Sequence, residues 1–320
     1  MIPQVRFDRV ALLLKNSPAA LRVTARSRRP GTHPKDWFSG VDDDTWFWMN
    51  TQGRRRLKAV AAIVPGVPDE ATQSLYTGSS EDESFAEGFR AYQIFKSCYE
   101  KYVGELSASR GILDFGCGWG RIIRFFLRDV VPSKLRGVDH AKQAINICRE
   151  TNQWASFQLI EPQPPTPLPA GAFDLVYLYS VFSHLPEELH LDLLRDFHRL
   201  LVPGGLLIAT TRGRDFIEAC AAMRASPNAS INRQTAQRFT DVEASLAAFD
   251  RGEYCYENYG SEGRWAFWGE ALIPRGYVVR RWSEIFQVLD YIDDRKLCAQ
   301  NVIVAQKPIE RNLADREGGA

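Results

Sequence analysis

Two kinds of hydrophobic pattern alternate over the middle of the chain. Short apolar runs recur, and between them lie stretches whose apolar residues fall every three or four positions. The short runs occupy residues 111–115, 134–139, 155–160, 173–180 and 206–211. Apolar strands separated by helices are typical of a parallel sheet that is covered on both faces. The pattern therefore predicts an α/β fold with a doubly wound, Rossmann-like sheet.

Two later segments extend the predicted sheet. Residues 277–282, YVVRRW, and residues 301–307, NVIVAQK, have the composition of strands. They bring the sheet to about seven strands, and one late strand is expected to run antiparallel. We expect the core to span 75–212, the last strands to span 269–308, and a polar tail to follow over 309–320.

The segments flanking the core are expected to act as lids. Residues 1–74 are expected to form an irregular extension that ends in a linker over 63–74. The large aromatic side chains of this extension are Trp37, Phe38, Trp46, Phe47 and Trp48. They are too apolar to remain in water, so they should pack on the core or cover a pocket. A helix is predicted over 82–103, and residues 213–268 are expected to form an insertion that covers the acceptor.

Composition and charge narrow the class of protein. The 320 residues include 40 basic and 39 acidic side chains, so the broad positive charge of a nucleic-acid binder is missing and no nucleic-acid partner is expected. The run Arg54, Arg55 and Arg56 is interpreted as a solvated surface. None of the six cysteines forms a C-x-x-C pair and no histidine pair has metal spacing, so no metal site is expected. Reduced thiols are typical of a cytoplasmic protein. The protein is expected to be either a monomer or a homodimer. The apolar run VALLL near the N-terminus is too short for a membrane span.

A glycine-rich stretch, ILDFGCGWGR, lies at residues 112–121. Its glycines fall at 116, 118 and 120, between a predicted strand and a predicted helix. This spacing differs from the G-x-G-x-x-G of dinucleotide sites, and the P-loop pattern G-x-x-x-x-G-K-[ST] is also missing. A strand-to-helix turn alone needs fewer glycines, so the stretch predicts a loop that approaches an anionic ligand.

The stretch LDFGCGWGR resembles motif I of class I S-adenosylmethionine-dependent methyltransferases. The resemblance continues through GVDHAKQAI, FDLVYLYSVFSHL and LLVPGGLLIATT, and it is nearer to bacterial small-molecule and glycan-associated enzymes. The residues that it implies for the cofactor site are Asp114, Gly116, Cys117, Gly118, Arg121, Asp139, His140, Tyr179 and Ser180.

Several of these residues have roles that the resemblance implies and the chemistry explains. Asp139 ends the second strand, where a carboxylate can accept hydrogen bonds from both ribose hydroxyls. Arg121 pairs either with the cofactor carboxylate or with a carboxylate of the N-terminal segment. His140 lies either beside the adenine or simply in the turn. Cys117 is interpreted as a small residue in a tight loop and not as a nucleophile. Many relatives have an acid after the third strand, and here Glu161 is an uncertain substitute.

Candidate residues for the methyl acceptor lie in two places. His184 follows the fourth strand and is either a general base or a residue that packs against the next helix, and we favour packing. Other candidate bases are Glu253, Glu257 and Tyr259. The insertion also supplies the aromatic residues expected at the acceptor, which are Tyr256, Tyr259 and Trp265. The same aromatic residues also suit a dimer contact or a small core.

The sequence thus predicts a methyltransferase that moves a methyl group from S-adenosylmethionine to a small molecule or glycan, at oxygen. The alternatives are N-methylation of a small molecule or protein side chain, and a cofactor-binding subunit or regulator without catalysis. The acceptor itself is not specified by any of these motifs.

Overall fold

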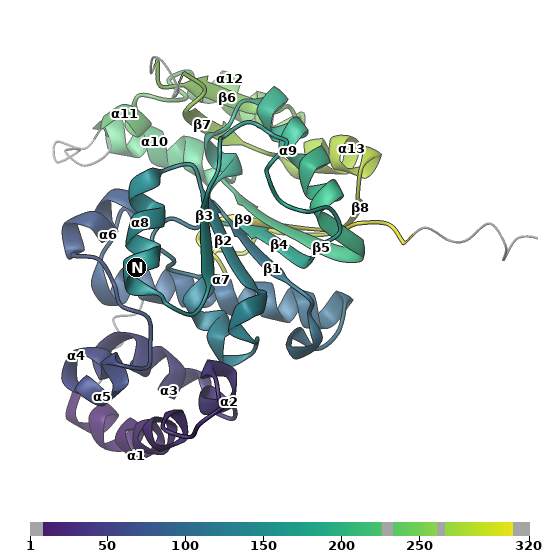
Figure 1. Cartoon of the computed structure of the whole chain (residues 1–320). Coiled ribbons are helices and arrows are strands. Elements are labelled where there is room, and N and C mark those ends of the chain that lie inside the picture. The colour runs from purple at the N-terminus through teal and green to yellow at the C-terminus, as the bar shows by residue number, and fades with distance from the viewer. Residues whose placement is uncertain (1–8, 226–232, 261–265, 310–320) are drawn as a thin grey trace, which may run out of the picture. The chain divides into compact units, whose positions relative to one another are not determined.

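The computed structural model describes residues 9–225, 233–260 and 266–309 (Figure 1). Seven strands form one sheet in the order β3-β2-β1-β4-β5-β9-β8. The strands are β1 (Ile112–Phe115), β2 (Leu135–Asp139), β3 (Ser156–Leu159), β4 (Phe173–Leu178), β5 (Leu201–Thr211), β8 (Gln287–Ile292) and β9 (Asn301–Gln306). The ladders β1·β4, β2·β3 and β4·β5 are parallel, and β9 runs antiparallel to both β5 and β8. The predicted α/β sheet with a late antiparallel strand is confirmed.

Helices and one smaller sheet make up the remaining elements. The helices before β1 are α1 (Arg9–Ser27), α2 (Pro34–Phe38), α3 (Asp43–Trp48), the π-helix η1 (Met49–Gly53), α4 (Arg54–Arg56), α5 (Lys58–Ala61), α6 (Glu70–Thr77), α7 (Glu81–Tyr102) and η2 (Leu106–Ala108). Those between β1 and β5 are η3 (Ile123–Arg128), η4 (Pro132–Lys134), α8 (Lys142–Thr151), η5 (Phe182–His184) and α9 (Glu187–Leu200). The later elements are α10 (Asp215–Ala225), α11 (Arg233–Ala236), α12 (Val242–Asp250), α13 (Arg275–Arg281), η7 (Trp282–Glu284), and the paired strands β6 (Cys255–Asn258) and β7 (Gly269–Leu272). None of the described helices is long and apolar enough to cross a membrane.

The chain divides into two compact units. The first holds the residues up to Lys96, with Glu105–Ala108 and Cys117–Leu159. The second holds Ser97–Gly104, Ser109–Gly116 and the residues from Ile160 onward. The division therefore passes through the glycine loop, between two consecutive residues of the chain.

The N-terminal segment is helical, so the prediction of an irregular extension was wrong. Its turn formers and charges interrupt the apolar periodicity, but they also supply caps that start short helices. The Asp42 side chain accepts from the amide of Thr45 at 2.9 Å and begins α3. Asp69 accepts from the amide of Thr72 at 2.8 Å and begins α6. The buried indole of Trp46 donates to a backbone carbonyl of η3, so aromatic packing fixes these short helices.

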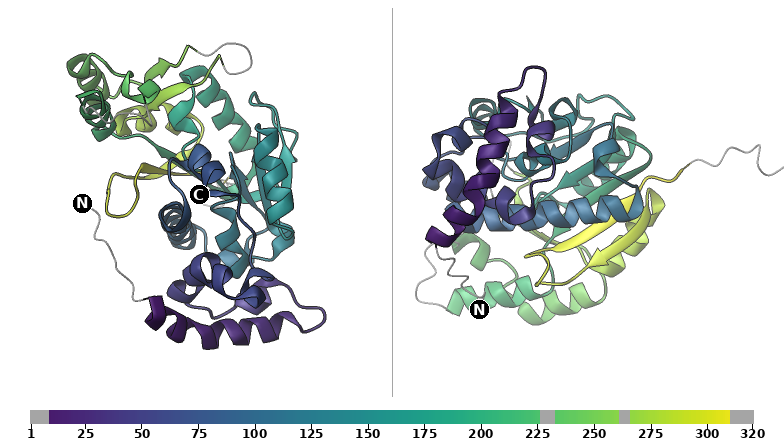
Figure 2. Two further views of the ribbon diagram at one scale, coloured as in Figure 1. Left: turned by 90° about the vertical axis from the view of Figure 1, so that its left-hand side faces the viewer. Right: turned by 90° about the horizontal axis from the view of Figure 1, so that it is seen from below.

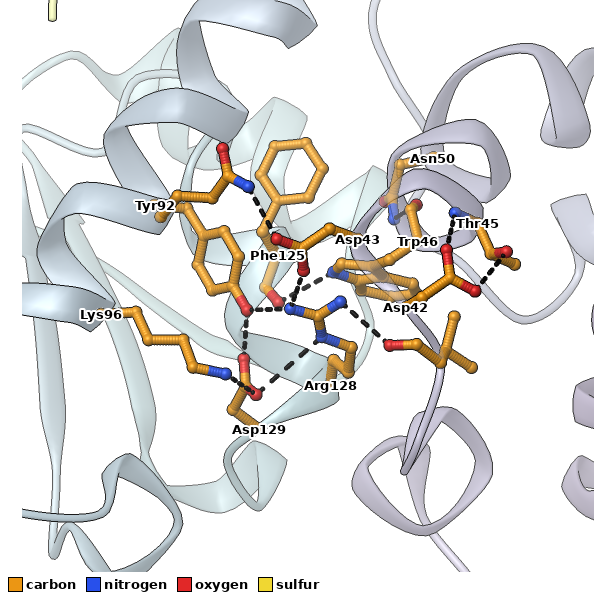
Figure 3. A network of polar contacts seen from close by, with 12 residues as sticks. Asp42, Asp43, Thr45, Trp46, Asn50, Tyr92, Lys96, Phe125, Arg128 and Asp129 are labelled. Atoms are coloured by element: carbon orange, nitrogen blue, oxygen red, sulfur yellow. Dashed lines mark hydrogen bonds and ion pairs between the residues drawn. The ribbon is translucent and has the colours of Figure 1, made fainter. Parts of the chain in front are cut away.

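A polar network also fastens these helices within the first unit (Figure 3). At its centre the guanidinium of Arg128, on η3, lies 2.6 Å from a carboxylate oxygen of Asp43 on α3. The same nitrogen of Arg128, Nη2, also donates to the hydroxyl of Tyr92 on α7 at 2.8 Å. Tyr92 donates in turn to the carboxylate of Asp129. The buried positive charge of Arg128 is therefore met by carboxylates, as a buried charge requires.

In the second unit, residues 277–282 form part of a helix, so the strand predicted there was wrong. The run of valines and aromatics suggested a strand, but Tyr277 and Val278 are buried on one side of α13 and Trp282 is buried in the 3₁₀ turn that follows. Pro274 precedes the helix, where a fixed φ and a missing N–H are tolerated. β9 pairs with β5 on one side, and the strand on its other side is β8. Figure 2 shows β8 and β9 side by side in yellow.

The helix α9 buries a histidine among apolar side chains. Leu193 and Phe197 face the core, and His190 on the same helix has no exposed surface. The ring of His190 stacks on Phe182 at 4.2 Å, and its Nε2 accepts from the indole N–H of Trp282 at 2.9 Å. Burial lowers the pKa of His190 to about 3, so the imidazole is neutral in the folded protein.

This buried histidine should make the protein sensitive to mild acid. The unfolded chain binds a proton at His190 near its ordinary pKa of about 6.5, whereas the folded protein does so only near 3. The contribution of neutral His190 to the free energy of unfolding is therefore fully present above pH 6.5, and it is lost as the pH falls toward the pKa of the folded state. We expect the free energy of unfolding, measured in urea, to fall by about 2 kcal/mol from this residue between pH 7 and pH 5. The variant His190→Gln should flatten that dependence, and an unchanged pH profile would contradict the assignment.

Candidate active site

The glycine loop follows β1 and makes a tight turn. In the first unit, the amide of Cys117 donates to the carbonyl of Val138 on β2 at 3.0 Å, which holds the loop to that strand. Gly116 has a φ of +74° and Gly118 a φ of +52°, in the left-handed region that side chains disfavour. Bare backbone in such a turn can approach a ligand closely.

The two glycines face different surroundings. A Cβ atom added at Gly116 would lie 2.4 Å from the side chain of Val181, so protein packing alone excludes a larger residue there. A Cβ atom added at Gly118 would meet, among the described residues, the ring of Tyr76 at 3.8 Å. The space beside Gly118 is therefore one that a side chain would fill and a ligand can occupy.

The carboxylate of Asp139 lies at the end of β2 and organises this loop. One oxygen accepts from the amide of Gly118 at 2.9 Å, and the other accepts from the amide of Ala141 at 2.8 Å. Each oxygen keeps further acceptor capacity, so the group can still receive the two hydroxyls of a ribose. His140 lies beside it, with Nδ1 at 3.5 Å from a carboxylate oxygen. The sequence analysis missed Tyr76, whose pKa is raised by burial and by the charge of Asp139.

Arg121 contacts the core helix α7. Its Nη1 lies 2.7 Å from a carboxylate oxygen of Glu87 and donates to the carbonyl of Ser84 at 3.1 Å. One carboxylate partner of Arg121 therefore comes from α7. A contact of Arg121 with the cofactor stays a prediction.

A second group of the predicted residues follows β4 in the second unit. Ser180 is held at a φ of +59°, which is strained for a residue with a side chain. Its amide donates to the hydroxyl of Thr210 at 2.8 Å, and its own hydroxyl accepts from the amide group of Gln300 at 2.8 Å. The Thr210 hydroxyl donates to Gln300 at 2.7 Å and closes the ring of contacts. Thr210 and Gln300 were not found from the sequence, because they come from β5 and from the turn before β9.

His184 lies at the end of η5 and packs on an aromatic ring. Its imidazole stacks on the indole of Trp268 at 4.5 Å with an interplanar angle of 11°. Its Nδ1 lies 2.9 Å from the carbonyl oxygen of Gly269, and this nitrogen must donate because a carbonyl only accepts. Burial lowers the pKa of His184, and the charge of Glu270, 3.9 Å from Nδ1, opposes that shift. The imidazole is thus neutral with its proton on Nδ1.

Glu270 is the centre of a buried polar cluster on β7. Its side chain is 1% exposed and accepts from the hydroxyls of Tyr259 and Thr235. Nε of Arg212 donates to it at 3.3 Å, and the guanidinium carbon of Arg212 lies 4.2 Å from the centre of the Phe216 ring. Three polar groups from distant parts of the chain therefore converge, with His184, around one carboxylate.

The other acceptor candidates lie on or near β6. The hydroxyl of Tyr256 donates to the carbonyl of Phe267 at 2.6 Å. Glu253 is an exposed residue that pairs with Arg251 at 2.6 Å, and Glu161 is also exposed. Of the remaining predicted residues, Asp114 is buried in β1 and Cys117 is buried in the loop. Tyr179 and Glu257 are half-buried. Trp265 lies outside the described residues.

The polar groups around the glycine loop fit S-adenosylmethionine, and the described residues form no metal centre. Within residues 9–225, 233–260 and 266–309, no group of three or more histidine, cysteine, aspartate or glutamate side chains could hold a metal ion. All six cysteines are buried and free of disulfides. The acid at the end of β2 suits a ribose, and the open backbone at Gly118 suits a ligand that lies along the loop.

Comparison with known protein families agrees with this geometry. Residues 112–205 match the family model of a methyltransferase domain. The chain carries a class I S-adenosylmethionine-dependent methyltransferase domain. S-adenosylmethionine is accordingly the cofactor of this domain.

Individual relatives cover different parts of the chain. The tRNA N(3)-cytidine methyltransferase METTL2 of Gallus gallus is 31% identical over 133 residues, which is 39% of this chain and 36% of that protein. The chain thus spans about a third of the length of that relative. Among solved structures, an S-adenosylmethionine-dependent methyltransferase from Mesorhizobium loti has a TM-score of 0.46 at 14% identity, with 69% of this chain and 98% of that chain covered. The plantazolicin methyltransferase BpumL, in complex with SAH, has a TM-score of 0.44 at 14% identity, with 93% and 99% covered.

Removal of the Asp139 carboxylate should weaken cofactor binding. We expect Asp139→Ala to raise the dissociation constant of S-adenosylmethionine about 5- to 150-fold, since a buried polar contact contributes about 1–3 kcal/mol. Calorimetry with the purified variant measures this change directly.

Asp174→Ala is the matched control for that substitution. Asp174 also accepts from two backbone amides, those of Arg110 and Gly111, but at the start of β4. This variant should lose stability and keep its cofactor affinity. Equal affinity losses in the two variants would show that Asp139 acts only through folding.

Proposed function

We propose that this methyltransferase acts on a hydroxyl oxygen of a small-molecule or glycan acceptor, with His184 as the general base. The observation that carries the proposal is the 2.9 Å contact between Nδ1 of His184 and the carbonyl oxygen of Gly269. Because Nδ1 donates to the carbonyl of Gly269, Nε2 of the neutral ring carries a lone pair. A lone pair in this position, just after β4, can accept the proton of a hydroxyl group.

The chemistry divides between the cofactor and the protein. S-adenosylmethionine supplies a methyl carbon bonded to a positively charged sulfur. Nε2 of His184 would accept the proton that the acceptor hydroxyl gives up as its oxygen takes the methyl group. Burial keeps the imidazole neutral and ready to accept this proton, since it lowers the pKa of His184.

The surroundings of His184 support a neutral, hydroxyl-bearing acceptor. Trp268 offers an aromatic ring of the kind on which apolar faces and sugars stack. Glu270, which is buried next to it, places a carboxylate in this region and would repel a polyanion. Arg212 is engaged by that carboxylate and by the ring of Phe216. The net charge of +1 for the whole chain agrees with an uncharged acceptor.

A nitrogen acceptor in RNA is the second candidate, and one observation favours it. The relative from Gallus gallus is named as a tRNA N(3)-cytidine methyltransferase and is 31% identical over 133 residues. The buried carboxylate of Glu270 and the near-neutral charge argue for the oxygen acceptor. A subunit that binds the cofactor without catalysis is the third candidate.

A transfer assay with the purified chain separates these candidates. Radiolabelled S-adenosylmethionine is offered with hydroxylated small molecules and sugars in one arm and with unmodified tRNA in the other. Label in the first arm supports the proposal. Label confined to tRNA would overturn it, and tight cofactor binding without transfer in either arm would favour the non-catalytic subunit.

The pH dependence of the rate should report the titration of His184. The base is active when neutral, so its lowered pKa should keep the rate high at and below the ordinary histidine pKa of about 6.5. We expect His184→Gln to lower kcat about 10²- to 10⁴-fold and to remove the acid limb of the profile. A small loss of rate with a lower melting temperature and an unchanged pH profile would show that His184 only packs.

The tyrosines near β6 should affect acceptor binding and spare the cofactor. We expect Tyr256→Ala and Tyr259→Ala to raise the KM of the acceptor about tenfold, with the dissociation constant of S-adenosylmethionine unchanged. Tyr277→Phe is the control, since that hydroxyl donates to Glu187, away from the cluster around Glu270. Parallel losses of acceptor and cofactor affinity would assign these tyrosines to the cofactor site.

A further inference from the structure

Two arginines on the 3₁₀ helix η3 are buried in the first unit, and their partners differ. Arg128 reaches the carboxylates of Asp43 and Asp129, as Figure 3 shows. Arg124 is 1% exposed and donates, through one nitrogen, to the carbonyl oxygens of Pro65 and Gly66. A carbonyl carries only a partial charge, so among the described residues the full positive charge of Arg124 has no matching negative one.

The remaining nitrogens of Arg124 have no hydrogen-bond partner in the part of the chain that the structure describes. Nε and Nη1 are both buried and both unpaired. The guanidinium carbon lies 5.1 Å from the centre of the Phe85 ring and 5.5 Å from that of Trp119. Aromatic faces stabilise a cation but cannot accept these N–H groups as a carboxylate would. A buried N–H donor of a charged group is destabilising when it has no acceptor.

A second arginine adds to this unbalanced positive charge. Nε of Arg54, on α4, is also buried without a partner among the described residues. Burial, followed by the positive charge of Arg54, lowers the pKa of Arg124 to about 9. The indole N–H of Trp119 is another buried donor without a described partner. These groups are donors with a positive field, which is the chemistry that recognises an anion.

We propose that Arg124 and Arg54 bind one small oxyanion, a carboxylate or a phosphate. Its oxygens would accept from the unpaired nitrogens and neutralise the buried charge. Two sources offer this chemistry, namely free inorganic phosphate and the carboxylate of the cofactor's methionine portion. The cofactor carboxylate is one of these sources because Trp119 lies between Gly118 and Gly120 of the glycine loop. The inference does not depend on the identity of the methyl acceptor, and its tests require no methyl transfer.

The free source is tested by thermal unfolding of the full chain in phosphate and in chloride at equal ionic strength. A ligand that binds only the folded state stabilises it by mass action, so phosphate near a hundred times its dissociation constant should raise the melting temperature by roughly 5 °C. Arg124→Met and Arg54→Met should each lose this increment. Arg55→Met is the matched control, since Arg55 is paired with Asp82 at the surface and its loss should leave the increment intact.

The cofactor source is tested by calorimetry with two nucleosides. S-adenosylhomocysteine carries the carboxylate, and 5′-methylthioadenosine lacks it. If the carboxylate occupies the site, Arg54→Met should weaken S-adenosylhomocysteine at least tenfold and leave 5′-methylthioadenosine unchanged. That pattern supports the proposal even where phosphate has no effect.

One pair of results overturns the proposal. Wild type would show no difference between phosphate and chloride, and neither arginine variant would discriminate between the two nucleosides. Arg124→Met would then be as stable as wild type or more stable, as expected when an uncompensated buried charge is replaced by an apolar side chain. Should Arg124→Met fail to fold, the wild-type response and the half-buried Arg54→Met still decide the question.

Discussion

The carboxylate of Asp139 is the constraint on which the cofactor end of the first unit depends. It accepts from the amide of Gly118 in the glycine loop and from the amide of Ala141 before α8. One side chain therefore fixes the turn after β1, the end of β2 and the start of the next helix. Because both oxygens are anchored by backbone amides, their free lone pairs have fixed directions, which is the preorganisation that a ribose ligand would require.

The polar groups of the second unit fix the orientation and the tautomer of His184. The Gly269 carbonyl on β7 sets the tautomer of His184, and Glu270 gathers Tyr259 and Arg212 beside it. Neither effect requires the histidine to move. The contacts made by β7 thus hold the imidazole neutral and in one orientation.

The regular core could be predicted from sequence because each element there carries its own periodic signal. The apolar runs of the parallel strands and the helical spacing of α8 and α9 needed no distant partner. The N-terminal helices could not be predicted in this way, since segments as short as α2 are fixed by caps and by packing of Trp46 against η3. The helix at 277–282 was missed because valine and aromatic residues favour strands when considered locally.

Within the candidate site, the glycine loop could be predicted from the spacing of its glycines. The acid at the end of β2 could be predicted from its place after the second apolar run. The contacts of His184 were not, since its partner is a backbone carbonyl 85 residues away and any residue type supplies one. Glu270 gave no signal either, because a single acid in a short strand looks like a surface residue until folding buries it.

The insertion after β5 has a core of its own. Ile217, Cys220, Phe239, Cys255 and Leu272 are buried together, and partly buried side chains such as Phe249 pack against them. A segment that buries its own apolar side chains can change in length and sequence while the sheet keeps its packing. Evolution can therefore change this segment as a module without redesign of the sheet.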